Sequence, residues 1–234
     1  HTNHAFGYRA LKSNTTGAAN VAVGHSALTT NTTASNNTAL GYQALYSNTT
    51  TDAVVAVGWA AGYSKTTTGS NFAQTYVGTK AGYSNQTGID NTYIGGYSGF
   101  TSTGSYNTAL GSGSLYSNTT ASGNTAAGYK ALYANTTGSA NVAVGQEALI
   151  AATTGSHNTA IGHTAAISLT TGTFNVAVGR EALRNLTSGG NNNAIGYSAL
   201  RNNTGNNNNA MGYAALYHNT SGAQNTAIGH DALN

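Results

Sequence analysis

One short pattern of polar and apolar residues recurs along the whole chain. Its clearest form is Asn-Thr/Val-Ala-aliphatic-Gly, as in residues 20–24 and 158–162. The anchoring glycines are mostly 17 residues apart, with two intervals of 16 and one of 20. These glycines are Gly7, Gly24, Gly41, Gly58, Gly78, Gly95, Gly111, Gly128, Gly145, Gly162, Gly179, Gly196, Gly212 and Gly229. A fixed short period is typical of a solenoid in which each copy forms one coil.

The segment that ends at each glycine is predicted to be a β-strand. It is short, rich in β-branched residues and alternates with period two. Helices are unfavourable because Gly, Asn and Thr are poor helix formers and the period is too short for a helical hairpin. Stacked copies would pair as parallel strands about 4.7–4.9 Å apart. We therefore expect an all-β protein, a parallel β-solenoid (β-roll) of about fourteen 17-residue coils that forms one domain over residues 1–234.

Alternation along the strand also predicts which side chains point inward. The positions one and three before the glycine share one face, and their aliphatic residues are expected to fill the core. The alanine two before the glycine would then point outward, together with the asparagine four before it. So thin a core gains from burying a second face, and small alanines let another chain approach closely. We therefore expect the chain to bind itself, as a homotrimer about the long axis or as an end-to-end filament.

The asparagine and glycine columns are expected to be structural rather than ligand-binding. Asparagine side chains in successive coils can donate to one neighbour and accept from the other. A recurring glycine suits a corner that needs positive φ or close backbone approach. These roles are assigned to Asn20, Asn141, Asn158, Gly24, Gly41, Gly145 and Gly162.

Composition argues against several classes of function. Charged residues make up 6% of the chain, and the net charge of +3 is scattered, so no nucleic-acid partner is expected. Cysteine is absent, which excludes disulfides and thiolate metal sites. No apolar run approaches the roughly 20 residues of a membrane helix, so no membrane insertion is expected.

The chain begins without methionine and stops within a repeat, and we interpret it as a fragment of a longer fibre.

No constellation for catalysis or metal binding is apparent. The five acidic residues are in separate coils, and no pair suggests acid–base chemistry. No column places histidines in neighbouring coils, and the Gly-rich stretches lack the Lys-Ser/Thr of a phosphate loop. We expect no enzyme activity and no cofactor.

Two aromatic columns are candidates for binding or for stacking. One residue after the glycine stand Tyr8, Tyr42, Trp59, Tyr129, Tyr197 and Tyr213. Five after it stand Tyr46, Tyr63, Tyr83, Phe100, Tyr116, Tyr133 and Tyr217. Aromatic faces stack on sugars, so a glycan-binding strip is one interpretation. Ring stacking from coil to coil is favoured, because aromatic pairs stabilise a fold by about 0.5–1.5 kcal/mol.

The loop between strands carries a threonine column eight residues after most glycines, from Thr15 to Thr220. A regular threonine array suggests an ice-binding face, but the companion threonine is adjacent and would face the other way. A hydroxyl ladder that supports the turn is favoured. The loop also contains Asn-x-Ser/Thr triplets, which are formal glycosylation acceptors. They begin at Asn14, Asn31, Asn48, Asn85, Asn118, Asn135 and Asn219.

The repeat is irregular around residues 54–100. The interval between Gly58 and Gly78 is 20 residues, and Gln74 and Tyr76 replace the usual asparagine and alanine. Tyr93 and Gly99 continue the deviation in the next coil. Insertions in solenoids often map to a binding face. The alternative is simple decay of the repeat.

The motifs Asn-Thr-Ala-Ile-Gly and Asn-Val-Ala-Val-Gly, followed by Ala-Leu, resemble the head repeats of trimeric autotransporter adhesins. Residues 128–138, Gly-Tyr-Lys-Ala-Leu-Tyr-Ala-Asn-Thr-Thr-Gly, are more similar to repeats of bacteriophage tail fibres. The resemblance implies a left-handed trimeric β-roll on a virion or cell surface. It implies a structural or adhesive segment of an extracellular fibre that spaces or presents a receptor-binding region. The alternatives are repeats that themselves bind ice or a cell-surface glycan, or a glycosylated filament.

Overall fold

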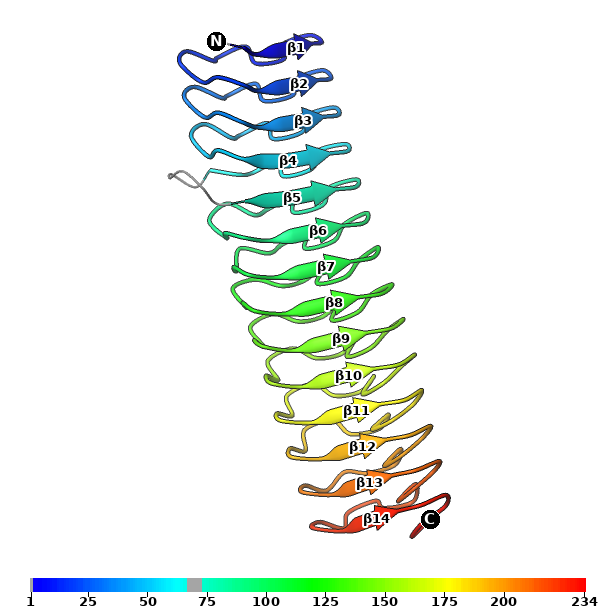
Figure 1. Ribbon diagram of the computed structural model, residues 1–234. Coiled ribbons are helices and arrows are strands. Elements are labelled where there is room, and N and C mark those ends of the chain that lie inside the picture. Colours follow the sequence, from blue (N-terminus) through cyan, green and yellow to red (C-terminus); the bar gives the residue numbers. More distant parts are fainter. Residues whose placement is uncertain (1, 67–72) are drawn as a thin grey trace. The chain divides into compact units, whose positions relative to one another are not determined.

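The computed structural model is an all-β parallel solenoid, described for residues 2–66 and 73–234 (Figure 1). Its strands form one parallel sheet in chain order, β1 to β14, and the described residues contain no helix and hence no candidate membrane span. The strands are β1 (His4–Phe6), β2 (Val21–Val23), β3 (Thr38–Leu40), β4 (Val54–Val57), β5 (Gln74–Val77), β6 (Thr92–Ile94), β7 (Thr108–Leu110), β8 (Thr125–Ala127), β9 (Val142–Val144), β10 (Thr159–Ile161), β11 (Val176–Val178), β12 (Asn193–Ile195), β13 (Asn209–Met211) and β14 (Thr226–Ile228). The predicted fold class and coil length are confirmed.

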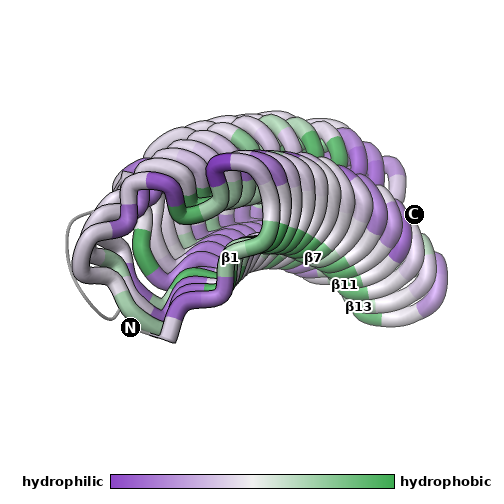
Figure 2. The backbone as a smooth tube through the Cα atoms, turned by 90° about the horizontal axis from the view of Figure 1, so that it is seen from above, coloured by the Kyte–Doolittle hydropathy of each residue, from purple (hydrophilic) through white to green (hydrophobic). Residues whose placement is uncertain are grey.

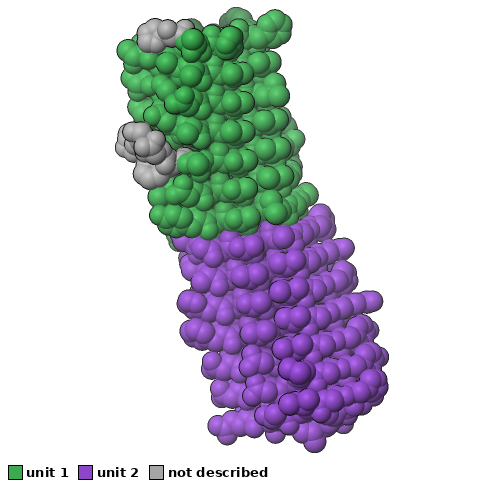
Figure 3. Space-filling view, viewed as in Figure 1, with its two compact units in different colours: residues 1–120 green, residues 121–234 purple. Residues whose placement is uncertain are grey.

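The chain divides into two compact units, residues 1–120 and 121–234 (Figure 3). The first contains β1 to β7 and the second β8 to β14. Both follow the same coil plan, in which equivalent residues pair in register. In the second unit, for example, Ala160 pairs with Ala143 on one side and Ala177 on the other. Seen along the coils, the strands form one wall and the turns form the others (Figure 2).

The residues that point inward are the reverse of the expected set. In β10, Ala160 is fully buried whereas Ile161 is 41% exposed. In β2 to β14 the residue two before the glycine is always buried. The prediction that aliphatic residues of the strand fill the core and the alanines face a partner is therefore wrong. The coil interior is narrow: it takes alanine from the strand wall and leucine, such as Leu149, from the opposite wall.

The inward asparagines form a ladder in which the backbone takes part. Asn158 Oδ1 accepts bonds from the backbone N–H of Asn175 at 3.0 Å and from its Nδ2 at 3.1 Å. Asn158 Nδ2 donates to the carbonyl of Gly172 at 2.8 Å. Asn20 and Asn141 make the equivalent contacts in their coils. The buried amide groups of Asn20, Asn141 and Asn158 are thereby satisfied at both nitrogen and oxygen, which is the condition for placing a polar group in a core.

The anchoring glycine is required by the approach of the next coil. Gly162 has φ of +140°, and a Cβ there would lie 2.5 Å from the carbonyl oxygen of Gly179. Gly24, Gly41 and Gly145 have the same conformation and the same obstruction. The close stacking that aligns the coils therefore excludes any side chain at this corner.

The turn after the strand contains left-handed residues that are not glycine. Lys130 has φ of 53° and Leu132 has φ of 52°, and equivalent positions repeat this along the chain. Such a conformation costs an L-residue about 1–2 kcal/mol. The coil-to-coil hydrogen bonds hold it in place: Leu132 N donates to Ala148 O at 3.0 Å. Strain of this kind persists only when the surrounding structure fixes the backbone.

Candidate functional site

The most extensive candidate surface is the outward side of the sheet. It consists of the residues one and three before each anchoring glycine, and we call it the outer face. In most coils the residue directly before the glycine has an exposed apolar side chain. These residues include Leu40, Ile94, Leu110, Val144, Ile161, Ile195, Met211 and Ile228. The other file is mostly Thr and Val. Between β12 and β14 the outer face is hollowed by about 250 Å³ beside Ile195, Met211 and Ile228.

The outer face carries none of the chain's eight Lys/Arg and five Asp/Glu residues. Most charged side chains instead follow the glycine, at the turn after the strand, as Lys80, Lys130 and Glu147 do. Each unit therefore has an uncharged, partly apolar sheet face and a separate charged edge. Large contiguous exposed apolar surfaces are typical of sites at which proteins bind one another.

The aromatic column five residues after the glycine forms a continuous stack in the first unit. Centroid distances between successive rings are 5.0–5.3 Å and interplanar angles are 4–19°. The rings are Tyr46, Tyr63, Tyr83, Phe100 and Tyr116. Each inner ring has a neighbour against both faces, so its faces are not open to a sugar. The geometry matches the stacking interpretation, and it is unfavourable for a glycan platform along this file.

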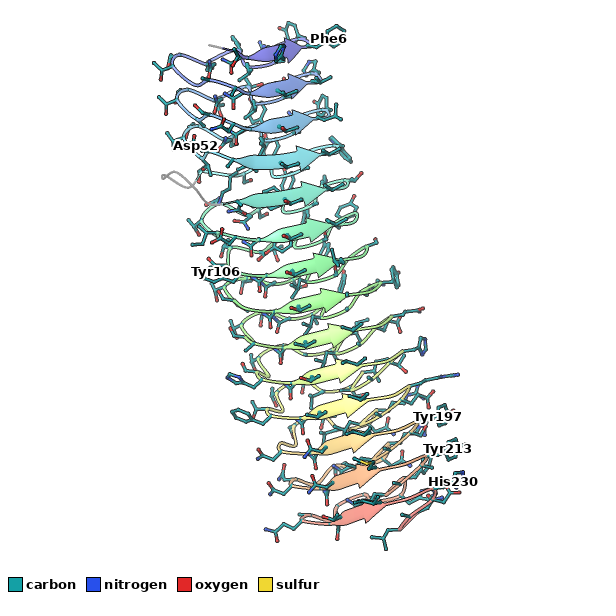
Figure 4. The ribbon with its side chains drawn as sticks, viewed as in Figure 1. Phe6, Asp52, Tyr106, Tyr197, Tyr213 and His230 are labelled. Carbon is teal, nitrogen blue, oxygen red and sulfur yellow. The ribbon has the colours of Figure 1, made fainter. Side chains whose placement is uncertain are left out.

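The column next to the glycine stacks in a similar way. Tyr197 lies 5.2 Å from Tyr213, which lies 4.8 Å from His230, both at 9° (Figure 4). His25 lies between Tyr8 and Tyr42 at 5.1 and 5.2 Å.

Where this column is not stacked, lysines cover the rings. Lys80 Nζ lies 4.7 Å from the centroid of the Trp59 ring. Lys130 Nζ lies 5.2 Å from the Tyr129 ring and also 5.5 Å from the ring of Tyr133, which belongs to the column five residues after the glycine. These cation–π contacts also use ring faces that a sugar would need.

The threonine column bonds along the solenoid. Thr15 Oγ1 donates to the carbonyl of Thr32 at 2.9 Å, and Thr136 Oγ1 donates to that of Thr153 at 3.0 Å. Thr32, Thr103, Thr153 and Thr170 make the same bond in their coils. The structure thus contains the hydroxyl ladder. Because the hydroxyl protons are used internally, the column is less suited to an ice-binding role.

The glycosylation candidates point into the coil. Asn31, Asn48, Asn85, Asn118 and Asn135 are fully buried, and only Asn14 and Asn219 are partly exposed. Asn135 Nδ2, the atom that would carry a glycan, donates to the carbonyl of Gly138 at 2.9 Å. This burial is unfavourable for glycosylation of the folded chain. Sequence reasoning treated the triplets as surface loops because it could not determine which side chain of the loop faces inward.

An acidic residue and three arginines form the main charged cluster of the second unit. Glu181 accepts a bond from Arg201 Nε at 2.9 Å and lies 3.5 Å from Arg184 and 3.8 Å from Arg180. Burial raises the pKa of the Glu181 carboxyl, but the Arg201 hydrogen bond and the three positive charges together lower it below its usual value. The cluster borders an open depression of about 450 Å³ that Tyr197 and Tyr213 also line.

The irregular coils hold a buried polar cluster that the sequence did not reveal. Lys65 occupies the inward position that asparagine holds in other coils, and its Nζ donates to the carbonyl of Gly88 at 2.6 Å. Gln74 Nε2 donates to the same oxygen at 2.5 Å, and Tyr76 Oη donates to Gln74 Oε1. Burial lowers the pKa of the Lys65 amine to about 8. The signal in the sequence was the joint replacement of two asparagines and an alanine in one coil.

The deviating residues Gln74, Tyr76 and Tyr93 of β5 and β6 are buried inside the coil. The additional residues of this coil fall between Lys65 and Gln74 in the sequence, and residues 67–72 lie outside the described part of the chain. Among described residues, no group of three or more His, Asp or Glu could hold a metal ion.

Comparison with known protein families, curated proteins and solved structures finds no match to this chain.

Proposed function

We propose that this chain is a structural segment of an extracellular fibre, on a virion or cell surface, that joins copies of itself through the outer face. In this proposal it has no catalytic activity and spaces or presents a receptor-binding region. The observation that supports it is the uncharged outer face, with exposed apolar residues recurring in most coils.

The occupant that fits this face best is a second copy of the same chain. A partner that covers the whole outer face needs side chains that repeat at the spacing of the coils. An identical solenoid has that spacing. Two sheet faces can then pack with interdigitating side chains about 10 Å apart. The resemblance of the repeats to phage fibres and adhesin heads supports a homotrimer, with an end-to-end filament as the alternative.

Charge substitutions on neighbouring residues test this assembly. The double variant Val144→Glu/Ile161→Glu places two charges on the outer face. The matched control Gln146→Glu/His163→Glu adds two charges to exposed positions of the same coils. In sedimentation velocity we expect the wild type and the control to be trimers, and the outer-face variant to dissociate with unchanged circular dichroism. A wild type that is a stable folded monomer at every concentration would overturn the proposed assembly.

Shortening by whole coils tests the role as a spacer. Deleting residues 141–174 joins Ala140 to Asn175 and keeps the repeat in register. The full-length protein with this deletion should still fold, assemble and support attachment of the particle or cell that carries it. Loss of attachment by a folded, assembled deletion variant would instead show that these repeats bind the receptor, and would favour the glycan-binding alternative.

A further inference from the structure

The cluster of Lys65, Gln74 and Tyr76 joins an amine and a carboxamide in the core of one coil. Both nitrogens donate to the carbonyl oxygen of Gly88, at 2.6 Å for Lys65 Nζ and 2.5 Å for Gln74 Nε2. The two nitrogens are therefore separated by no more than the sum of these distances. Gln74 Cδ, the electrophilic carbon, is one covalent bond from Nε2.

The carboxamide is also held at its oxygen. Tyr76 Oη donates to Gln74 Oε1, and burial raises the pKa of Tyr76 well above its usual value, so the hydroxyl keeps its proton. A donor fixed on a carbonyl oxygen stabilises the negative charge that develops there when a nucleophile adds. Tyr76 itself is fixed, because Gly62 and Gly82 leave the space that its ring fills.

We propose that Lys65 and Gln74 form an intramolecular isopeptide bond, with Tyr76 as the hydrogen-bond donor to the reacting carbonyl. The Nζ lone pair adds to Cδ, and the carbonyl electron pair moves onto Oε1. The carbonyl then re-forms as the Cδ–Nε2 bond breaks. One proton passes from Nζ to Nε2, with the Gly88 oxygen beside both atoms, and Nε2 leaves as ammonia. The step needs no oxidant, cofactor or further reactant.

Local conditions favour this step. Only the neutral amine is a nucleophile, and a lysine with an ordinary pKa near 10.4 is almost fully protonated at neutral pH. Burial lowers the pKa of Lys65 to about 8, so a larger fraction is neutral. Lys65, Gln74 and Tyr76 are each at most 1% exposed, which keeps water from competing for the carbonyl. The bond would join Lys65 covalently to Gln74 within the buried cluster.

Intact-mass spectrometry of the purified wild-type protein tests the proposal directly. We expect a mass lower than the sequence mass by one ammonia, and more complete conversion after incubation at about pH 9 than at about pH 6, since the neutral amine reacts. Trypsin should fail to cleave after Lys65, and fragmentation of the resulting peptide, residues 13–80, should show an internal ring that joins Lys65 to Gln74. A full sequence mass after incubation at alkaline pH, with normal cleavage after Lys65, would overturn the proposal.

Succinimide formation at an asparagine also releases ammonia, so two comparisons separate the reactions. The variant Lys65→Met should retain the full mass, whereas a succinimide would form in it as before. Wild-type chain that is produced in inclusion bodies and kept in denaturant from the start, so that it has never folded, should also retain the full mass and should lose ammonia only after folding, which covers the case in which Lys65→Met fails to fold. Tyr76→Phe keeps both reacting groups and should slow the reaction. Ammonia loss that persists in Lys65→Met or in denaturant would assign the loss to another site.

Discussion

Tyr93 fills the space that a leucine occupies in regular coils, and Gly99 makes room for it. A Cβ on Gly99 would lie 2.5 Å from Cε2 of the Tyr93 ring. Regular coils have the opposite pair, such as Ala39 with Leu45, both fully buried. The Tyr93 hydroxyl donates to Ser102 Oγ at 2.8 Å, so its polar end is satisfied. At these two facing positions a coil thus has room for one large side chain, from either wall.

This relationship predicts strong coupling between the two positions. Tyr93→Ala should lower the free energy of unfolding by about 3–5 kcal/mol, because it leaves a cavity. Gly99→Leu alone should also destabilise, because its side chain meets the tyrosine ring. The double variant recreates the regular pair and should regain about 2–3 kcal/mol relative to the sum of the two single changes. Denaturant unfolding of the wild type, the two single variants and the double variant measures this coupling free energy. Strictly additive losses of unfolding free energy would show that residues 93 and 99 do not share one space.

Gly95 and Gly96 are adjacent but should respond in opposite ways to alanine. Gly95 has φ of +130°, and a Cβ there would lie 2.6 Å from the backbone of Gly111. Gly95→Ala should therefore cost about 3 kcal/mol or more, as strain adds to the clash. The nearest atom to a Cβ on Gly96 is Ser112 Oγ at 4.0 Å. Gly96→Ala should be neutral or stabilise by up to about 1 kcal/mol. Thermal unfolding of both variants measures the two changes in stability. Equal losses of stability would show that close approach of the next coil does not require glycine at position 95.

Replacing one ladder asparagine with aspartate should give a pH-dependent loss of stability. In Asn158→Asp, a carboxylate oxygen would face the carbonyl of Gly172 and Oδ1 of Asn141, which now accept bonds from Nδ2. A buried, unpaired charge costs about 3–5 kcal/mol. Burial would raise the folded-state pKa of this carboxyl, so the penalty should be full near neutral pH and should shrink as the pH falls through that pKa.

The exposed residue Asn185, which bonds Asn202 across neighbouring coils, provides the matched control. Asn185→Asp should change the free energy of unfolding by no more than about 0.5 kcal/mol. Urea unfolding at neutral and acidic pH compares the two variants. An equally small effect at Asn158 would show that the ladder does not contribute to stability.

The arginine cluster predicts a second pH effect of smaller size. The net effect of its neighbours lowers the folded-state pKa of Glu181, so its contribution is present above the unfolded-state pKa and is lost as the pH falls through the folded value. Glu181→Gln should lower the free energy of unfolding near neutral pH by about 1 kcal/mol or less, because the group is near the surface. The difference from wild type should vanish at about pH 3. Glu147→Gln, in the same column but with no ion pair among described residues, is the matched control for loss of a carboxylate near neutral pH.

The sequence predicted which side chains interact along each column better than it predicted whether those side chains point into or out of the coil. Ladders of asparagine, threonine and aromatic residues follow from identical residues at a fixed spacing, and the stacks from Tyr46 to Tyr116 show this. The left-handed turn residues Lys130 and Leu132 had no such signal, because neither residue type prefers that conformation. The Lys65 cluster was likewise hidden, because residues apart in the sequence meet only after the coils stack.

The sequence by itself determined that this protein is a solenoid, how long each coil is and where its strands lie. A glycine at each corner and a period of about 17 residues suffice, because every coil repeats the same local preferences. Only the tertiary structure decided which strand face is the core. In Val142-Ala143-Val144 both faces are apolar, so hydrophobicity cannot choose between them. The narrow interior selects the smaller side chain, and the larger residues form the exposed outer face.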